Sequence, residues 1–230
     1  MKPFRISEVC FDLVDTYPNS ENLLAVALAM NRAERECVLR LWVTEGIPFG
    51  FREAPIVYET VRGWLAGRLG VNPKEITLIG SARLGYSLVK APNYGRQFGS
   101  HSDMDLTVIS EPLFLQLVDT FNDWKDEFSD GRIQPRNETE RGYWEENINR
   151  LVPDNISRGF IDKHLIPNRY PSTQNISQAM YILGEKLKVT ARAPQVRKAS
   201  VRVYRSWDAF IAQISLNFWT TLMSFRKATH

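Results

Sequence analysis

The feature that most constrains this chain is a pair of short apolar segments separated by a glycine–serine step and an acidic pair. Ile76–Ile79 is an apolar run, and Gly80 and Ser81 follow it directly. A second run, Leu106 to Ile109, comes immediately after an Asp-x-Asp pair. Short apolar runs bounded by turn residues are typical of buried strands. The sequence therefore predicts two strands, one followed by a turn into a helix and the other preceded by two acids.

The acidic pair is Asp103 and Asp105. Residues two apart in a strand point to the same face, so these carboxylates are expected to stand side by side. Two charges about 4 Å apart repel by about 1 kcal/mol in water and about 4 kcal/mol at an intermediate dielectric. A divalent cation relieves this repulsion, and Mg²⁺ commonly shares one or two carboxylates with substrate phosphates. The pair is compatible with a site for Mg²⁺ or Mn²⁺; considered alone, it is more typical of a solvated strand edge.

The turn at Gly80 and Ser81 supplies a second kind of binding group. Glycine permits a sharp turn and a close approach of the backbone to a ligand. The first N–H groups of a helix that begins here have no partner within the helix, and a phosphate suits them. Serine is also a favoured capping residue, so the turn alone is consistent with an ordinary helix start. Together with the acidic pair, it predicts a site for a nucleoside triphosphate.

In this order the residues resemble the DNA polymerase β-type nucleotidyltransferase superfamily. The shared pattern is Gly-Ser-x-x-x-Gly, here Gly80, Ser81 and Gly85, followed by Ser-Asp-x-Asp-Leu, here residues 102–106. The resemblance covers about 35 residues of the chain. It implies an α+β fold in which helices flank a small mixed or antiparallel palm sheet.

The resemblance also implies roles for individual residues. In that family the Gly-Ser turn contacts the phosphates of the incoming nucleotide, two aspartates hold two Mg²⁺ ions, and a third carboxylate comes from a later strand. The metal ligands here would be Asp103 and Asp105. The nucleotide-binding residues expected on this basis are Gly80, Ser81, Arg83, Arg96 and Ser102, the arginines serving to neutralise phosphate charge.

Two features depart from the family pattern. The segment before the acids contains an insert, Val89 to Gly99, which is either a substrate loop or a longer hairpin. The strand pattern Val201 to Trp207 falls where the family has its third carboxylate, but it contains no acid. Asp208 follows directly and is the candidate for the third catalytic carboxylate, or else it caps the last helix. Without a third acid, Arg202 or Arg205 would face the nucleotide.

The rest of the chain is predicted to be mostly helical. We expect an N-terminal helical segment over 1–70 and a core over 71–230, in one compact unit. Apolar spacing and capping residues predict helices from Ser20 with a break at Asn31-Arg32, from Pro55 to Gly70, from Ser110 to Phe128, from Gln174 to Lys188 and from Asp208 to Lys227. The polar stretch 131–173 is expected to consist of loops and one short helix around Tyr143.

Composition excludes several classes of protein. No apolar run reaches 18 residues, so no membrane span is predicted. The N-terminus carries acids within its apolar part, unlike a signal peptide. Cys10 and Cys37 have neither metal-like nor redox-like spacing and are expected to be buried free thiols in the cytoplasm.

Positive charge is concentrated in one segment. The net charge is only +3, but Lys186 to Arg205 holds seven basic residues and no acid. Such a segment is suited to attract polyphosphate or RNA. It is equally consistent with a solvated surface that balances acids elsewhere.

Three functions follow from these features. The first is a Mg²⁺-dependent nucleotidyltransferase that moves a nucleoside monophosphate to RNA, a protein or a small acceptor, as in bacterial antiviral defence or toxin–antitoxin systems. The alternative is a nucleotide-binding module without activity, acting as an antitoxin or sensor. A third is an RNA-binding or structural protein that depends on the basic segment.

Overall fold

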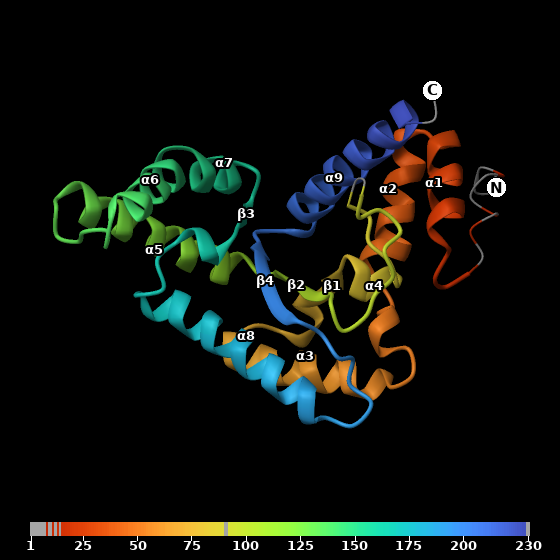
Figure 1. The fold of residues 1–230 in the computed structure, drawn as a ribbon, viewed down its shortest axis with the longest axis horizontal. Helices are drawn as coiled ribbons and strands as arrows, with labels where there is room; N and C mark the ends of the chain where they lie inside the picture. Colours follow the sequence, from red (N-terminus) through yellow and green to blue (C-terminus); the bar gives the residue numbers. More distant parts are fainter. Residues whose placement is uncertain (1–7, 9–10, 12, 14, 90–91, 229–230) are drawn as a thin grey trace, which may run out of the picture.

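A mixed sheet lies at the centre of the protein. The computed structural model describes residues 8, 11, 13, 15–89 and 92–228. Within these residues four strands pair in the order β1-β2-β4-β3. The strands are β1 (Ile76–Ile79), β2 (Asp103–Ile109), β3 (Phe160–Ile161) and β4 (Lys198–Tyr204). β2 is antiparallel to β1 and parallel to β4, whereas β3 is antiparallel to β4 (Figure 1).

Helices make up most of the remaining described chain. Before the sheet come α1 (Ser20–Ala29), α2 (Arg32–Val38), the π-helical turn η2 (Leu39–Thr44), the 3-10 turn η3 (Phe49–Phe51), α3 (Pro55–Leu69) and the 3-10 turn η4 (Pro73–Glu75). The later helices are α4 (Ser81–Leu84), α5 (Glu111–Ser129), α6 (Glu138–Glu146), the π-helical turn η5 (Asn147–Leu151), α7 (Val152–Ser157), the 3-10 turn η6 (Lys163–Leu165), α8 (Pro171–Val189) and α9 (Trp207–Ala228). The expected α+β fold, with a small sheet flanked by helices, is confirmed.

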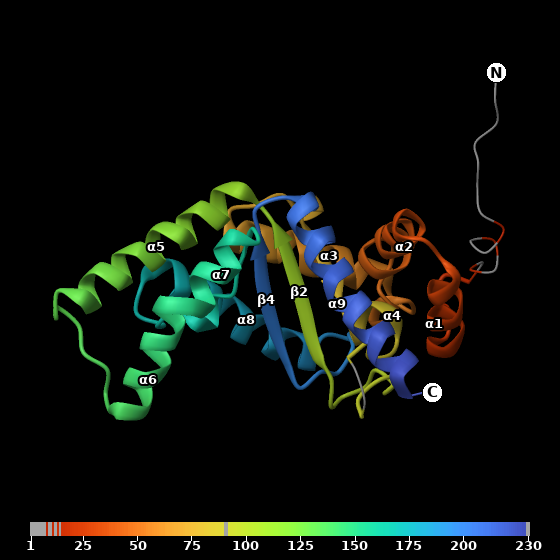
Figure 2. The same cartoon turned by 90° about the horizontal axis from the view of Figure 1, so that it is seen from above.

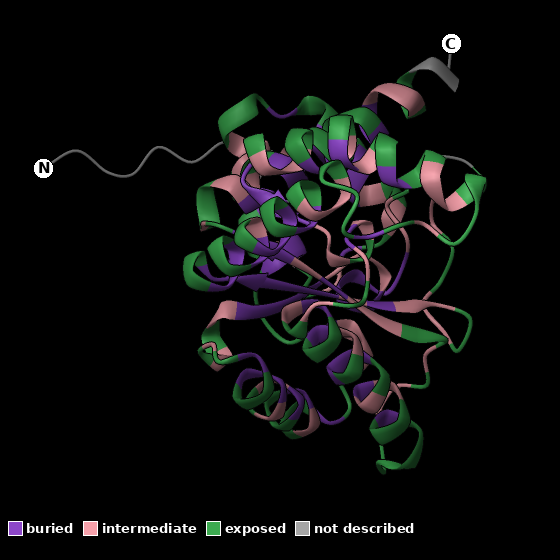
Figure 3. Cartoon of the chain, turned by 90° about the vertical axis from the view of Figure 1, so that its left-hand side faces the viewer, coloured by how far each residue is buried: buried purple, intermediate pink, exposed green. Residues whose placement is uncertain are grey.

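The sheet is the middle layer of the structure. Along β2, Met104, Leu106 and Val108 point into a core that they share with α3, α5 and α8. Ile109 of β2 and Tyr204 of β4 point to the opposite face, into a second core with α1, α2 and α9. Figure 1 shows α3 and α8 below the sheet and α2 and α9 above it. Figure 3 shows the buried strands between helices whose outer surfaces are exposed.

The second face is covered unevenly. Its apolar side chains lie at the carboxyl ends of β2 and β4, where Phe210 of α9 is fully buried against Tyr204. Towards the amino ends of the same strands, alternate residues are polar, and Asp103, Asp105 and Ser200 are only partly buried. In Figure 2, α5, α6 and α7 lie on the far side of β4 from β2. The polar half of this face borders a cleft.

Local capping explains the N-terminal helices. The Asn19 side chain accepts a hydrogen bond of 2.7 Å from the N–H of Asn22 and caps α1, so the predicted cap at Ser20 was wrong by one residue. Asn31 forms a capping box at the start of α2, which confirms the predicted break. α3 begins at Pro55 and ends before Gly70 in the left-handed conformation, also as predicted.

For residues 131–173 the predicted short helix around Tyr143 is present, but it is much longer than expected. α6, η5 and α7 form a helical segment from residue 138 to residue 157 without interruption. Trp144, Ile148 and Val152 are its buried residues and recur every four positions. Trp144 packs edge-on against Trp124 of α5, with ring centroids 5.6 Å apart. Its length was underestimated because so few apolar side chains anchor it among many polar ones.

Two further expectations concern cysteine and membranes. Cys37 is a free thiol, but it is exposed, so its predicted burial was wrong; its Sγ lies 3.1 Å from Nη2 of Arg40. Cys10 lies outside the described residues. None of the helices in the described part of the chain has the length and hydropathy that a membrane crossing needs.

Arg83 lies in the protein interior. Only 2% of the residue is exposed, and Nη1 donates a hydrogen bond of 2.7 Å to the carbonyl of Ile47. Nη2 lies 3.4 Å from the carbonyl of Leu41. Burial lowers the pKa of the Arg83 guanidinium, although nearby Tyr17, Tyr58 and Glu45 oppose this. The side chain thus fastens the 41–47 segment to α4, directly after β1.

We expect Arg83→Met to lower the free energy of unfolding by about 1–3 kcal/mol, because the hydrogen bonds from the buried guanidinium to the carbonyls of Ile47 and Leu41 are lost. Arg96→Met is the matched control, since Arg96 is exposed and its replacement should change stability by less than about 0.5 kcal/mol. Urea unfolding of both variants measures the difference. Equal stability of the two variants would contradict the structural role of Arg83.

Candidate functional site

A cleft of about 1110 Å³ lies against the polar half of the second sheet face. Gly80 and Ser81, after β1, line one part of it, and Asp103 and Asp105 of β2 line the next. β4 and the residue before it contribute Arg197, Lys198, Ser200 and Arg202, and the chain after β3 contributes Asp162, Lys163 and His164. Ser177, Tyr181, Glu185 and Lys188 of α8 complete the polar lining on that side. Segments far apart in the sequence thus meet at one cleft.

Gly80 and Asp105 face each other directly. The register of β1 and β2 pairs Ile79 with Asp105, which brings the following turn beside this carboxylate. Gly80 has φ +68° and ψ −150°, a combination that is essentially restricted to glycine. A Cβ atom placed on Gly80 would lie 3.4 Å from Oδ2 of Asp105. The absence of a side chain therefore keeps the space between the turn and the acid open.

Asp103 is paired with two cations. Its Oδ1 accepts from Nε of Arg197 and its Oδ2 from Nη2, both at 2.9 Å. Nζ of Lys198 lies 3.8 Å from Oδ2. The hydrogen bonds from Arg197 lower the pKa of Asp103, and the charge of Lys198 adds to this against a smaller effect of burial. The carboxylate is therefore ionised at neutral pH.

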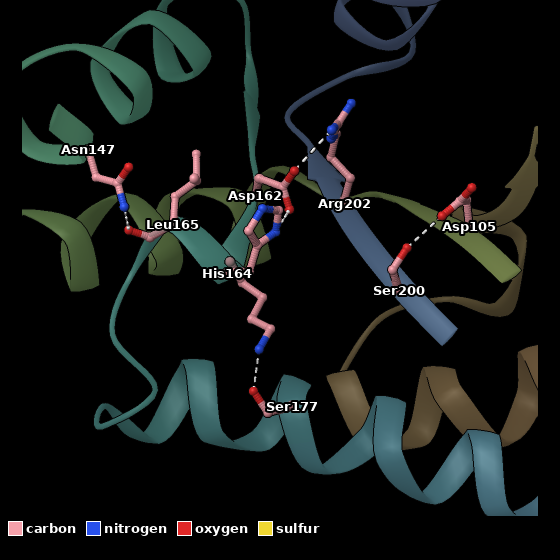
Figure 4. Close-up of polar contacts among 9 residues, drawn as sticks. Asp105, Asn147, Asp162, His164, Leu165, Ser177, Ser200 and Arg202 are labelled. Atoms are coloured by element: carbon pink, nitrogen blue, oxygen red, sulfur yellow. Dashed lines mark hydrogen bonds and ion pairs between the residues drawn. The ribbon is translucent and has the colours of Figure 1, made fainter. Parts of the chain in front are cut away.

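The residues opposite the acids on β4 carry no negative charge. The parallel register pairs Asp103 with Lys198, Asp105 with Ser200 and Thr107 with Arg202. Oγ of Ser200 donates a hydrogen bond of 2.7 Å to Oδ1 of Asp105 (Figure 4). At the position nearest to Asp105 on the neighbouring strand, this protein thus has a hydroxyl group.

Asp208 lies away from Asp103 and Asp105. It lies in the first turn of α9, four residues beyond the end of β4, whereas the acidic pair adjoins the start of β4. It lines a separate cavity of about 820 Å³ between α2 and α9. It does not serve as the cap of α9 either: Ser206 precedes the helix, and its Oγ accepts from the N–H of Ala209 at 3.2 Å.

A third acid, which sequence reasoning did not select, lies elsewhere in the cleft. Asp162 follows β3 and accepts from Nη2 of Arg202 at 2.9 Å and from Nδ1 of His164 at 2.7 Å (Figure 4). Burial alone raises the pKa of Asp162, but the hydrogen bond from His164 and the charge of Arg202 outweigh it and lower the pKa. In the structure Phe160 packs on the second sheet face and Ile161 on the first, so Asp162, the next residue, returns to the face of the cleft.

The remaining predicted nucleotide-binding residues lie outside the lining of the cleft. Oγ of Ser102 accepts from the N–H of Gly99 at 3.2 Å, which closes the turn before β2. Arg96 is exposed on the insert, and Arg83 is in the interior. The described residues on either side of the insert's tip pair with each other: the N–H of Ser87 donates to the carbonyl of Arg96, and the carbonyl of Ser87 accepts from the N–H of Gly95. Val89, the first residue of the insert, and the preceding Ser87 and Leu88 line the cleft.

The acid content of the site limits the metals it can hold. In the described ranges no group of three or more histidine, cysteine, aspartate or glutamate residues is arranged to hold a metal ion. Asp103 and Asp105 can offer two carboxylates, the number that Mg²⁺ commonly shares with substrate phosphates. The donor set therefore fits one hard cation that completes its ligands with phosphate and water.

Comparisons of this chain with protein-family models, with curated proteins and with solved structures find no match. The function of the site is therefore inferred from its own side chains and backbone groups.

The conformation of Gly80 leads to a stability prediction. Gly80→Ala should lower the free energy of unfolding by about 1–3 kcal/mol, because alanine is strained at this φ and ψ. Gly63→Ala is the matched control, since a Cβ atom at Gly63 in α3 meets nothing within 4 Å. It should raise stability by about 0.5–1 kcal/mol. Chemical unfolding of the two variants should give shifts of opposite sign; shifts of the same sign would refute this assignment.

The Asp162 carboxylate leads to a prediction about pH. Because the pKa of Asp162 lies below its ordinary value of 3.8, the unfolded state takes up this proton first as the pH falls. Its stabilising effect is complete above about pH 5 and disappears as the pH falls through the folded-state pKa. We expect Asp162→Asn to be less stable than wild type by about 1–2 kcal/mol at pH 7, with a smaller difference at pH 3. A difference that stays constant between these pH values would contradict the assignment.

Proposed function

We propose that the cleft binds a nucleoside triphosphate together with Mg²⁺ or Mn²⁺ and transfers its nucleoside monophosphate to an acceptor. The observation that carries this proposal is the approach of the Gly80 turn to the Asp105 carboxylate, 3.4 Å from the position of a Gly80 Cβ atom. A turn without a side chain and an acid on the neighbouring strand are the two elements on which the resemblance to DNA polymerase β-type nucleotidyltransferases depends. RNA, a protein or a small molecule would serve as the acceptor.

The charge of the cleft supports a polyphosphate ligand. Arg197, Lys198, Arg202 and Lys188 all belong to the basic segment of the sequence, and all line the cleft. Each lies near an acid: Arg197 and Lys198 near Asp103, Arg202 at Asp162 and Lys188 at Glu185. Cations that line one cleft attract an anionic ligand. The position of these four residues in the cleft supports a polyphosphate ligand.

The ion pair between Asp103 and Arg197 can be exchanged for contacts of both residues with a ligand. The Arg197 side chain is 65% exposed and that of Asp103 is 22% exposed, so the guanidinium can be reached from solvent although it binds the carboxylate through two hydrogen bonds. A nucleotide that arrives with its metal ion can separate the pair by offering each partner a new contact. Asp103 then becomes available to the metal, and the guanidinium of Arg197 becomes available to two phosphate oxygens.

Asp103 and Asp105 would hold the metal ion, which neutralises phosphate charge and polarises the phosphorus that is attacked. Residues of the protein would bind the phosphates, orient the metal ligand and neutralise charge. The Gly80 turn leaves room for the terminal phosphates, and the Ser81 hydroxyl at the same turn can donate to them. Ser200 orients Asp105 by its hydrogen bond. Arg197 and Lys198 neutralise the charge that develops on the leaving pyrophosphate.

A second candidate is a nucleotide-binding module without transferase activity, acting as an antitoxin or a sensor. The observation that favours it is Ser200, a hydroxyl at the β4 position paired with Asp105, together with Lys198 and Arg202 at the flanking positions. Such a strand contributes no carboxylate to a second metal ion. This module would bind nucleotide mainly through its cations, so metal ions would change its affinity little.

Calorimetry with ATP, GTP, CTP and UTP, each with Mg²⁺ and with EDTA, separates the two candidates. For the transferase we expect Mg²⁺ to tighten binding at least about tenfold, the effect of 1.4 kcal/mol, and label at the α-phosphate to appear in RNA, protein or a small molecule from a cell lysate. Asp105→Asn should abolish both effects, because the metal loses one of two carboxylates.

Asp119→Asn, on the exposed side of α5, is the matched control and should behave as wild type. Binding that is indifferent to both Mg²⁺ and Asp105→Asn, without transfer, supports the binding module. The absence of nucleotide binding under every condition refutes both candidates.

A further inference from the structure

The chain after β3 places an acid, a histidine and an arginine in a fixed arrangement. Asp162 is held at both carboxylate oxygens, by Arg202 at 2.9 Å and by His164 at 2.7 Å. The Asp162 side chain is 13% exposed, whereas the His164 side chain is 68% exposed. The acid is thus fixed from two sides, while the imidazole that it holds remains accessible along the cleft (Figure 4).

The hydrogen bond determines which nitrogen of His164 is available. The ring contacts Asp162 through Nδ1, and an ionised carboxylate accepts hydrogen bonds only. The proton of the neutral imidazole therefore resides on Nδ1, which leaves the lone pair on Nε2 free to accept a proton. After Nε2 takes up a proton, the carboxylate stabilises the imidazolium that forms. This is the arrangement that a general base requires.

The pair also lies on the side of the cleft from which an acceptor would approach. In sheet order the Gly80 turn follows β1, the metal-binding acids lie on β2, Ser200 lies on β4, and Asp162 extends β3. Two strand spacings of about 4.8 Å and two residue rises of about 3.3 Å separate Asp105 from Asp162, or about 12 Å between Cα atoms. In an in-line displacement, the attacking oxygen enters opposite the leaving phosphates. With the leaving phosphates at Gly80, the acceptor enters over β4 and β3.

We propose that His164 is the catalytic base of the proposed nucleotidyl transfer, and that Asp162 and Arg202 are its positioning residues. The inference rests on the proposed function of the cleft. The hydroxyl oxygen of the acceptor forms a bond to the α-phosphorus while the bond from that phosphorus to the bridging oxygen breaks. Pyrophosphate leaves with the electron pair, and the hydroxyl proton moves to Nε2 of His164. His164 and Asp162 would thus replace a catalytic base on β4, because the β4 residue that pairs with Asp105 is Ser200.

Other titratable groups border the same space and have to be separated from His164. The elements packed against η6 are α8 and β4. Those of their titratable or charged side chains that line the cleft are Tyr181, Glu185 and Lys188 of α8 and Lys198 and Arg202 of β4. A pH profile alone does not distinguish among them, so the test compares variants at each pH.

The first measurement is the rate of label transfer from α-phosphate-labelled nucleotide to the lysate fraction that the wild type labels. We expect His164→Ala to reduce kcat by roughly 10²–10⁴-fold while the Kd for the nucleotide stays unchanged. The acidic limb of the pH profile of kcat should disappear, and added imidazole should restore part of the rate. Asp162→Asn should reduce kcat less and keep some pH dependence. His101→Ala, an exposed histidine outside the lining of the cleft, should match the wild type.

The second measurement does not depend on activity. Nitrogen NMR of the histidine side chains in the full chain, with His164 assigned through His164→Gln, reports the tautomer of each ring. We expect His164 to carry its proton on Nδ1 above its titration range, and Asp162→Asn to shift it towards the Nε2–H form. A His164 ring that is protonated on Nε2 in both proteins refutes the arrangement.

The outcomes separate the two proposals. If the wild type transfers label, Asp105→Asn does not, and His164→Ala retains both the wild-type rate and its pH profile, the base is refuted while the transferase stands. If the wild type transfers no label to any fraction, the transferase is refuted and the base with it. Loss of transfer in His164→Ala with retained nucleotide affinity and rescue by imidazole supports both.

Discussion

The parallel pairing of β2 with β4 determines what the site contains. In this register every cleft-facing residue of β2 lies beside a cleft-facing residue of β4, so Asp105 meets Ser200 and Asp103 meets Lys198. A shift by one residue would turn Val201 and Val203 towards the second sheet face and Ser200 and Arg202 towards the first core. The apolar residues on the opposite face prevent such a shift, because Val201 and Val203 are buried among the side chains of α3, α5 and α8. The packing of the core thereby fixes which polar groups face the acids.

This constraint also explains why the site is a cleft with a closed end. The same alternation that brings Asp103 and Asp105 to the second face brings Ile109 there as well, and Tyr204 accompanies it on β4. α9 begins at Trp207, three residues after β4, and covers that apolar end with Phe210. Polar side chains at the other end cannot be covered in this way without losing their hydration. One helix therefore closes half of the sheet face and leaves the polar half open to ligands.

The sequence alone was sufficient to predict an element where its local residue pattern agrees with the tertiary structure. The limits of β1 and the extended run from Asp103 to Ile109 follow from apolar strands that are bounded by turn residues, and both stand as predicted. The interior position of Arg83 was not predictable, because its partners are backbone carbonyls of a segment about forty residues earlier. The contribution of Asp162 was missed because β3 is only two residues long and lacks any period of its own. Long-range pairing, and not local propensity, decides these positions.

The two arginine–aspartate pairs of the cleft differ in exposure, and this difference separates their functions. Arg197 is 65% exposed and holds Asp103 beside the Gly80 turn, whereas Arg202 is 35% exposed and holds Asp162 on the far side of β4. The exposed guanidinium of Arg197 can be hydrated or bound by a ligand when it leaves Asp103, so a ligand can replace this contact. Removal of one partner from a largely buried pair leaves a charge without compensation, which is far more costly. The protein therefore has one acid that can change partners on ligand binding and one that stays in place, and only the second is suited to hold a histidine in a constant orientation.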